Sequence, residues 1–117
     1  MPTSETPLGS ADQLTNVLKA LAETVDHKVH GDPSKSYTAQ LFSDGPIRAG
    51  KKIAEEAAEL ALSIAAETKD EAAGEAADLL YHLLVGLRVK GVDLDTVAKV
   101  LASRQGLSGL EEKAARG

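Results

Sequence analysis

Four acidic residues at helical spacing are the part of this sequence best suited to chemistry. Glu56 and Glu59 lie three residues apart in one segment, and Glu75 and Asp78 repeat that spacing in a later one. Residues three apart share one face of a helix. Two such pairs on facing helices would repel and would raise one another's pKa values unless a cation neutralised them. The pattern therefore predicts a site for a divalent cation.

The ligand type indicates which ion this site would take. Carboxylate oxygens suit Mg²⁺, Mn²⁺ or Ca²⁺, whereas di-iron bundles use a Glu-x-x-His pairing that this sequence lacks. Mg²⁺ held by a few carboxylates keeps positions for water and for phosphate oxygens. We therefore expect Mg²⁺, with Mn²⁺ as a possible substitute, and chemistry on a phosphate ester or anhydride.

Several polar residues close to the acids have more than one interpretation. Lys52 precedes Glu56 by one helical turn, so it could contact a substrate phosphate or simply pair with Glu55 or Glu56. For Lys51 a salt bridge is the favoured interpretation. A histidine such as His82, in a mostly apolar helix, is more often a hydrogen-bonded core residue than a ligand or a base.

The segment between residues 30 and 45 concentrates polar and aromatic groups. Its composition predicts a loop with one short turn of helix. Tyr37 and Thr38 within it could meet a base or a phosphate, although a tyrosine ring packing over the bundle is an equally good explanation for Tyr37.

Helix signals predict the elements that position these residues. Ser10 with Gln13 forms a capping box, Asp44 can cap a second helix, and Thr68 with Glu71 forms another capping box. Gly91 is placed to end a third helix, and Asp93 caps a fourth. The expected helices cover about residues 11–30, 46–67, 69–90 and 94–104.

A short connection near Thr68 should make the second and third helices an antiparallel hairpin. The two acidic pairs lie about equally far before and after that reversal, so they should reach the same height in the hairpin.

Glutamates on helices are often merely solvated, and Glu55 and Glu56 could also favour a helix dipole. That explanation fails for Asp78, because Asp is unfavourable inside a helix and this one directly precedes two leucines. The metal site is the favoured interpretation of the combined pattern.

Composition limits the class of protein. The chain has 117 residues, a formal net charge of -5 and no cysteine, which predicts one domain without disulfides or thiolate metal sites. An acidic chain is poorly suited to binding nucleic acid, and no apolar run is long enough to cross a membrane. The start lacks the features of a signal peptide, so we expect a cytoplasmic protein. The predicted division is a domain over residues 10–105 with flexible ends at 1–9 and 106–117.

Three ordered blocks of sequence resemble a known family. The blocks are Ser36-Tyr37-Thr38-Ala39-x-Leu41, Lys52-x-x-Glu55-Glu56-Ala57-x-Glu59 and Glu75-x-Ala77-Asp78-Leu79-Leu80-Tyr81-His82-Leu83-Leu84-Val85. The acidic pairs are similar to the metal motif of the MazG-like all-α nucleoside triphosphate pyrophosphatases. Together the blocks resemble the phosphoribosyl-ATP pyrophosphatase family over about residues 14–104.

This resemblance implies an all-α, MazG-like antiparallel bundle of about four helices, completed by dimerisation. It also implies Mg²⁺-dependent hydrolysis of phosphoribosyl-ATP to phosphoribosyl-AMP and pyrophosphate in histidine biosynthesis, through attack by a water whose pKa the ion lowers. The implied metal ligands are Glu56, Glu59, Glu75 and Asp78. Glu55 would be a further ligand or would position the water, and Lys52 would contact a phosphate. Further candidates for substrate contacts are Tyr37, Thr38, Lys51 and His82.

The resemblance and the pattern agree on a homo-oligomer. The third predicted helix is apolar around most of its circumference, which favours an obligate dimer with helix packing between subunits. Some relatives carry a preceding cyclohydrolase domain, but the leading segment here is short and lacks cysteine, so we expect that enzyme to be a separate polypeptide. Gly86 stands where a bulky apolar residue is expected, which suggests close packing at that turn.

Two other functions fit the acidic pairs. A housecleaning pyrophosphatase acting on modified or excess deoxynucleotides would share them. A helical dimerisation module without catalysis would use them only to solvate one face.

Overall fold

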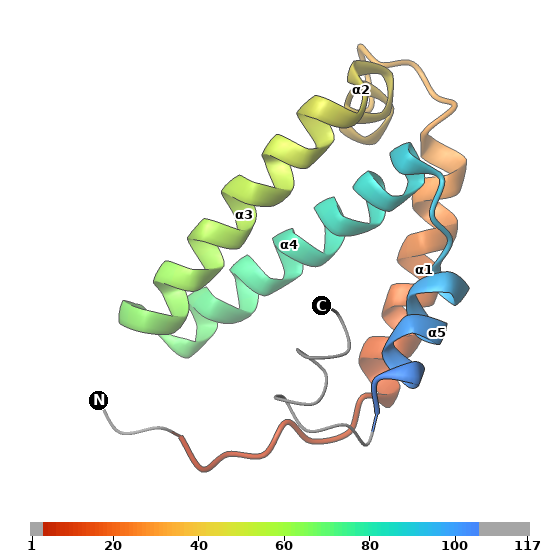
Figure 1. Ribbon diagram of the computed structural model, residues 1–117. Helices are drawn as coiled ribbons and strands as arrows, with labels where there is room; N and C mark the ends of the chain where they lie inside the picture. Colours follow the sequence, from red (N-terminus) through yellow and green to blue (C-terminus); the bar gives the residue numbers. More distant parts are fainter. Residues whose placement is uncertain (1–3, 106–117) are drawn as a thin grey trace, which may run out of the picture.

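The computed structural model describes residues 4–105 and contains five α-helices in this range, with no β-strand there. The helices are α1 (Asp12–Lys28), α2 (Tyr37–Asp44), α3 (Pro46–Ala66), α4 (Lys69–Lys90) and α5 (Leu94–Ser103) (Figure 1). The predicted all-helical fold is confirmed. Residues 106–117 and 1–3, parts of the predicted flexible ends, lie outside the described residues, and the domain limits remain a prediction. None of the described helices is long and apolar enough to cross a bilayer.

The two longest helices, α3 and α4, form the antiparallel hairpin that the sequence predicts (Figure 1). Thr68 starts α4, because its hydroxyl accepts a hydrogen bond of 3.1 Å from the Glu71 N–H. The predicted capping box is only half formed. The Thr68 hydroxyl donates to the Glu71 carboxylate over 3.2 Å, where a full box would bring that carboxylate to the Thr68 N–H. The reversal nevertheless lies where the sequence places it, so the two acidic pairs reach the same height.

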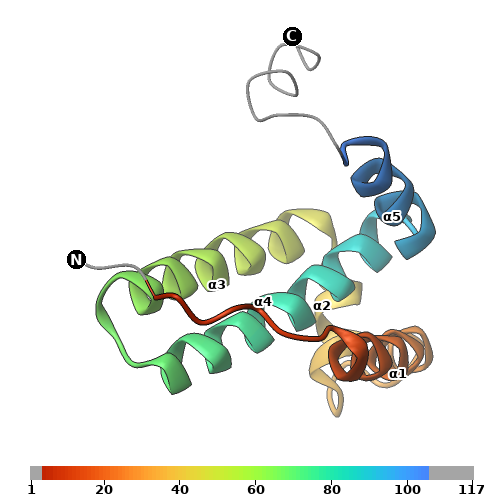
Figure 2. The ribbon, with the colours of Figure 1, turned by 90° about the horizontal axis from the view of Figure 1, so that it is seen from below.

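The other two helices before the hairpin, α1 and α2, pack against its open end. A small core forms there, built from Val25, Val29, Leu41, Leu84 and Val85. The half of the hairpin nearest Thr68 extends away from α1 and α2 (Figures 1 and 2). One end of the hairpin is therefore covered within the chain, while the other end is covered by no other helix of the described residues.

Three local predictions differ from the structure. Residues 37–44 form a helix of 8 residues where a loop with one turn was expected, because the Ser36 hydroxyl caps it by accepting from the Ala39 N–H over 3.2 Å. The prediction of a capping box between Ser10 and Gln13 is wrong. The Ser10 hydroxyl accepts a hydrogen bond from the Asp12 N–H over 3.1 Å, and Ala11 is the N-cap of α1. Asp44 does not cap α3, since Gly45 occupies that position with a φ of 91° and Asp44 instead pairs with Arg48 at 3.4 Å.

The end of α4 follows the prediction. Gly91 adopts the left-handed conformation with a φ of 80°, and the Asp93 carboxylate accepts from the Thr96 N–H over 2.8 Å to start α5. Gly86 is closely packed as expected, because a Cβ atom there would lie 2.5 Å from Cδ1 of Ile53 on α3. The absence of a side chain at Gly86 therefore lets the backbone of α4 lie close to Ile53 of α3, one turn after His82.

Candidate functional site

The hairpin brings the predicted acids together. One carboxylate oxygen from each of Glu56, Glu75 and Asp78 lies within 4.8 Å of the other two. Glu56 comes from α3, and the other two come from α4. Glu59 joins this group from α3, close enough to Glu75 to influence its protonation. We call Glu56, Glu59, Glu75 and Asp78 the carboxylate cluster. The predicted meeting of the two pairs across the helix seam is confirmed.

Two oxygens of the carboxylate cluster are buried without a hydrogen-bond donor. They are Oε2 of Glu56 and Oε2 of Glu75, and neither has a partner within residues 4–105. Glu56 is only 8% exposed, although it is a charged residue facing other charged residues. Such atoms are costly to bury unless something compensates them. A hard divalent cation accepts oxygen ligands of this kind, so the residues fit Mg²⁺ or Mn²⁺ chemically.

The protonation of Glu75 reports the crowding of negative charge. Its pKa is raised above the ordinary value of 4.5, chiefly because the carboxyl can share a proton in a hydrogen bond with Glu59. Burial raises the pKa further, and so do the negative charges of Glu59, Asp78 and Glu56. In the absence of a cation, the cluster therefore favours holding a proton.

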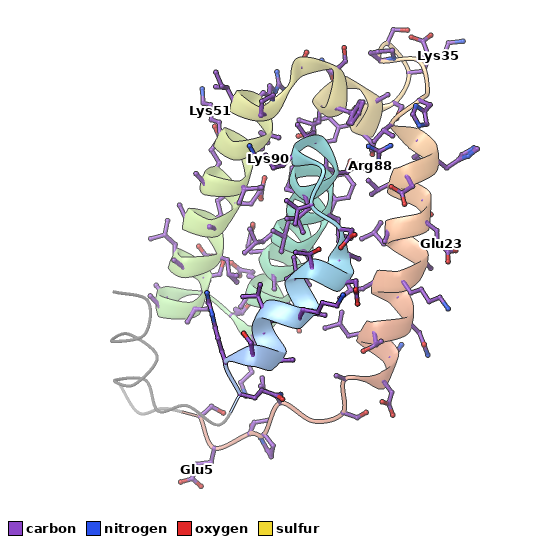
Figure 3. The ribbon with its side chains drawn as sticks, turned by 45° about the vertical axis from the view of Figure 1, so that its right-hand side comes forward. Glu5, Glu23, Lys35, Lys51, Arg88 and Lys90 are labelled. Carbon is purple, nitrogen blue, oxygen red and sulfur yellow. The ribbon has the colours of Figure 1, made fainter. Side chains whose placement is uncertain are left out.

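The ammonium group of Lys52 lies at the edge of the cluster. It is 3.2 Å from the Glu55 carboxylate and 3.7 Å from that of Glu56. The hydrogen bond to Glu55 is the main reason why the pKa of Lys52 is raised. Lys51 does not join this group: it is exposed on the outer side of α3 (Figure 3) and forms no ion pair within residues 4–105. The salt bridge favoured for Lys51 is therefore not found in the described part of the chain.

His82 connects the cluster to the start of α2. Its Nδ1 donates to the Asp78 carbonyl over 2.8 Å, because a carbonyl oxygen can only accept. With the proton on Nδ1, Nε2 accepts from the Tyr37 hydroxyl over 3.1 Å. His82 is 8% exposed. Both ring nitrogens are thus occupied, as expected of a hydrogen-bonded core histidine.

A second hydrogen bond joins α2 to α4 beside the first. The hydroxyls of Thr38 and Tyr81 are 2.6 Å apart, and Thr38 is buried. The rings of Tyr37 and Tyr81 stack with their centroids 6.3 Å apart, and each ring meets His82 edge-on. Tyr37 and Thr38 therefore belong to the first turn of α2 and form, with Tyr81 and His82, an aromatic wall one helical turn from Asp78.

The wall contains one residue, Tyr81, that is not among the site residues predicted from the sequence. Tyr81 follows Asp78 by three residues, so the helical spacing already places it on the same face. Its partner Thr38 is 43 residues away in the chain, and no local pattern predicts that contact. The structure brings together all the predicted site residues except Lys51.

Known proteins resemble this chain over most of its length. The model of the family described as "Phosphoribosyl-ATP pyrophosphohydrolase" matches residues 18–105. A phosphoribosyl-ATP pyrophosphatase from Caulobacter vibrioides (strain NA1000 / CB15N) is 48% identical over 106 residues, which cover 91% of this chain and 98% of that protein. Another, from Caulobacter sp. (strain K31), is 50% identical over 104 residues, covering 89% of this chain and 96% of the relative.

A longer relative matches over nearly the whole chain. It is the histidine biosynthesis bifunctional protein HisIE from Wolinella succinogenes, 47% identical over 114 residues. The match covers 97% of this chain and 49% of that protein. The extent of the family match and the identity to these relatives show that the chain belongs to the phosphoribosyl-ATP pyrophosphohydrolase family.

Proposed function

We propose that this protein hydrolyses phosphoribosyl-ATP to phosphoribosyl-AMP and pyrophosphate in histidine biosynthesis, using Mg²⁺ held by the carboxylate cluster. Family membership supports the substrate and the reaction. One water is consumed, and the anhydride bond between the alpha and beta phosphates is broken. The alpha phosphate stays on phosphoribosyl-AMP, and the beta and gamma phosphates leave as pyrophosphate. Mn²⁺ would be a chemically suitable substitute.

The observation that carries the metal proposal is the pair of buried oxygens on Glu56 and Glu75. They have no hydrogen-bond donor within residues 4–105. Asp78 offers a third oxygen within 4.8 Å of both residues' ligand atoms. A purely solvating set of acids would be expected to expose such atoms to water. A bound Mg²⁺ would lower the pKa of a coordinated water and offset negative charge on the departing pyrophosphate.

The remaining residues of the site have roles that follow from their positions. Lys52, whose ammonium is already held between two carboxylates, would turn to a phosphate oxygen when substrate is present. That movement would free the exposed Glu55 carboxylate to position a water. Tyr37 and His82 would border the substrate, with His82 fixing the Tyr37 hydroxyl. Lys51 would contribute only to the general attraction of the polyanionic substrate.

The experiment that tests this function measures pyrophosphate release from phosphoribosyl-ATP with Mg²⁺ and with EDTA. We expect turnover only with the metal, and a loss of about 100-fold or more in Glu56→Gln and Asp78→Asn. Glu23→Gln is the matched control, because it removes the same charge from an exposed position on α1 (Figure 3). A preference for deoxynucleoside triphosphates would contradict the substrate and favour a housecleaning enzyme.

A binding measurement separates the enzyme from a helical module without catalysis. Added Mg²⁺ should raise the melting temperature of the parent and of Glu23→Gln, because a ligand of the folded state stabilises it. The rise should be smaller in Glu56→Gln and Asp78→Asn. An equal response in all four proteins, or none, would contradict a metal site in the cluster.

The proposed assembly is a homodimer in the cytoplasm, with the following cyclohydrolase acting as a separate polypeptide. The thin core of the single chain and the uncovered half of the hairpin support the dimer. The location follows from the substrate, since a polyanionic nucleotide does not cross a bilayer unaided.

A further inference from the structure

A cavity of about 440 Å³ is bordered by three residues of the aromatic wall, Tyr37, Thr38 and Tyr81. It opens between the end of α1, the segment that follows it and the first turn of α2. The residues that give it its chemistry are His27, Lys28, Lys35, Ser36, Tyr37 and Tyr81. Cationic, hydroxyl and aromatic groups thus line one hollow.

The charge of this cavity is opposite to that of the rest of the molecule. The chain has a formal net charge of -5, yet Lys28 and Lys35 both line the hollow. Neither lysine forms an ion pair or a side-chain hydrogen bond within residues 4–105. No carboxylate lines the cavity. Two uncompensated ammonium groups beside hydroxyls favour a small polyanion as the occupant.

The cavity and the carboxylate cluster share a wall. Tyr37 and Tyr81 line the cavity, while Tyr37 is hydrogen-bonded to His82 and Tyr81 follows Asp78 by three residues on α4. Three residues of helix correspond to a rise of about 4.5 Å. A ligand anchored at the cluster by one end could therefore lie over the wall and reach the cavity with its other end.

The substrate of the proposed function has two charged ends of this kind. Phosphoribosyl-ATP is ATP that carries an added phosphoribosyl group, so it bears a monophosphate as well as a triphosphate. A metal held by carboxylates suits the triphosphate, and a cationic hollow suits the monophosphate. We propose that Lys28 and Lys35 bind the phosphate of the phosphoribosyl group and so make the enzyme prefer phosphoribosyl-ATP to ATP. This proposal rests on the proposed function.

The test compares the binding of two products that differ by the phosphoribosyl group. Phosphoribosyl-AMP and AMP are titrated by calorimetry, both with Mg²⁺, into the parent and into Lys28→Gln/Lys35→Gln. In the parent, phosphoribosyl-AMP should bind more tightly than AMP. The variant should lose about tenfold in affinity for phosphoribosyl-AMP for each lysine removed, as expected for charge-assisted hydrogen bonds. Its affinity for AMP should stay unchanged.

The matched control is Lys19→Gln/Lys69→Gln, which removes two exposed lysines that do not line the cavity. It should bind both ligands as the parent does. Circular dichroism and melting temperature establish that each variant is folded. Unchanged binding of phosphoribosyl-AMP in Lys28→Gln/Lys35→Gln, or an equal loss for both ligands, would overturn the proposal.

Failure of the cavity proposal is distinguishable from failure of the proposed function. The parent's turnover of phosphoribosyl-ATP tests the function alone. If the parent turns over the substrate and the double variant binds both ligands like the parent, the reaction stands and the cavity proposal falls. If the parent does not turn it over, the function falls, and the titrations still decide whether the two lysines recognise the added phosphate.

Discussion

Glu75 is the residue whose protonation depends most directly on the crowding of acids. In the metal-free protein its pKa lies above the ordinary 4.5, so the folded state holds this proton more tightly than the unfolded chain. The corresponding stability is present below pH 4.5 and is lost as the pH rises through the raised pKa. Without metal, this contribution to the stability of the fold is therefore smaller at neutral pH than at pH 4.

Replacing Glu75 by Gln removes this repulsion. We expect Glu75→Gln to melt at a higher temperature than the parent at pH 7 in EDTA, and at nearly the same temperature at pH 4. With Mg²⁺ the difference in melting temperature between the variant and the parent should become smaller or change sign, because the parent gains a bound ion and the variant has lost one oxygen ligand. Thermal unfolding between pH 4 and pH 8 measures this. If the variant were less stable than the parent in EDTA at pH 7, the negative charge of Glu75 would already be compensated in the parent without a metal ion.

The sequence predicted which acids meet, because spacing on a helix is a local property. Glu56 and Glu59 share a face of α3, as Glu75 and Asp78 share a face of α4, whatever surrounds them. Which oxygens are buried could not be predicted, since that depends on how closely α3 and α4 pack. The hydrogen bond between Tyr37 and His82 joins residues that are 45 apart in sequence, and only the fold brings them together.

At the scale of the element, the glycines of α4 provide a test of helix packing. Gly74 has no atom within 4 Å of an added Cβ, whereas at Gly86 that Cβ would lie 2.5 Å from Ile53. Alanine is favoured over glycine inside a helix by about 1 kcal/mol. We expect Gly74→Ala to gain about that amount in the free energy of unfolding. Gly86→Ala should gain less or lose stability, because Ile53 must move.

Chemical denaturation of the two variants and the parent measures the difference. The two substitutions are chemically identical and lie in the same helix, so each serves as the control for the other. A gain of equal size at both positions would mean that Ile53 yields without cost and that the close approach of α3 to α4 is unimportant for stability.

The helices could be predicted where a capping residue and an apolar pattern agree. Thr68, Gly91 and Asp93 each mark a boundary that the structure confirms. The errors come from positions where two capping residues compete or where a helix is short. Asp44 is a good capping residue in isolation, but it is already the last residue of α2 and pairs with Arg48. The 8 residues of α2 are stabilised largely by burial of Thr38, Ala39 and Leu41, which a local pattern does not reveal.

At the scale of the whole molecule, the single chain exposes much apolar surface. Leu62 and Ile64 are 63% and 72% exposed on α3, in the half of the hairpin that no other described helix covers. Exposed apolar surface of this kind favours association between copies. We expect light scattering at micromolar concentration to give twice the mass of one chain.

A charge placed on the uncovered half of the hairpin should weaken this dimer. Leu62→Glu should shift the mass toward that of one chain, because an unpaired carboxylate is costly to bury between subunits. Leu101→Glu is the control, since Leu101 is 64% exposed on α5, away from this half of the hairpin. A monomeric mass for the parent would contradict the dimer, and an unchanged mass for Leu62→Glu would place the interface elsewhere.

All four acids of the carboxylate cluster come from one uninterrupted stretch, the α3 and α4 hairpin, and the wall beside it adds only the preceding α2. Because the proposed metal site is encoded in one short stretch of sequence, a single recombination event can transfer all of its residues together to another gene. The 114-residue match that fills 49% of the longer Wolinella succinogenes protein fits such a transfer. Fusion and separation of this unit would then leave its chemistry intact while changing only what is tethered to it.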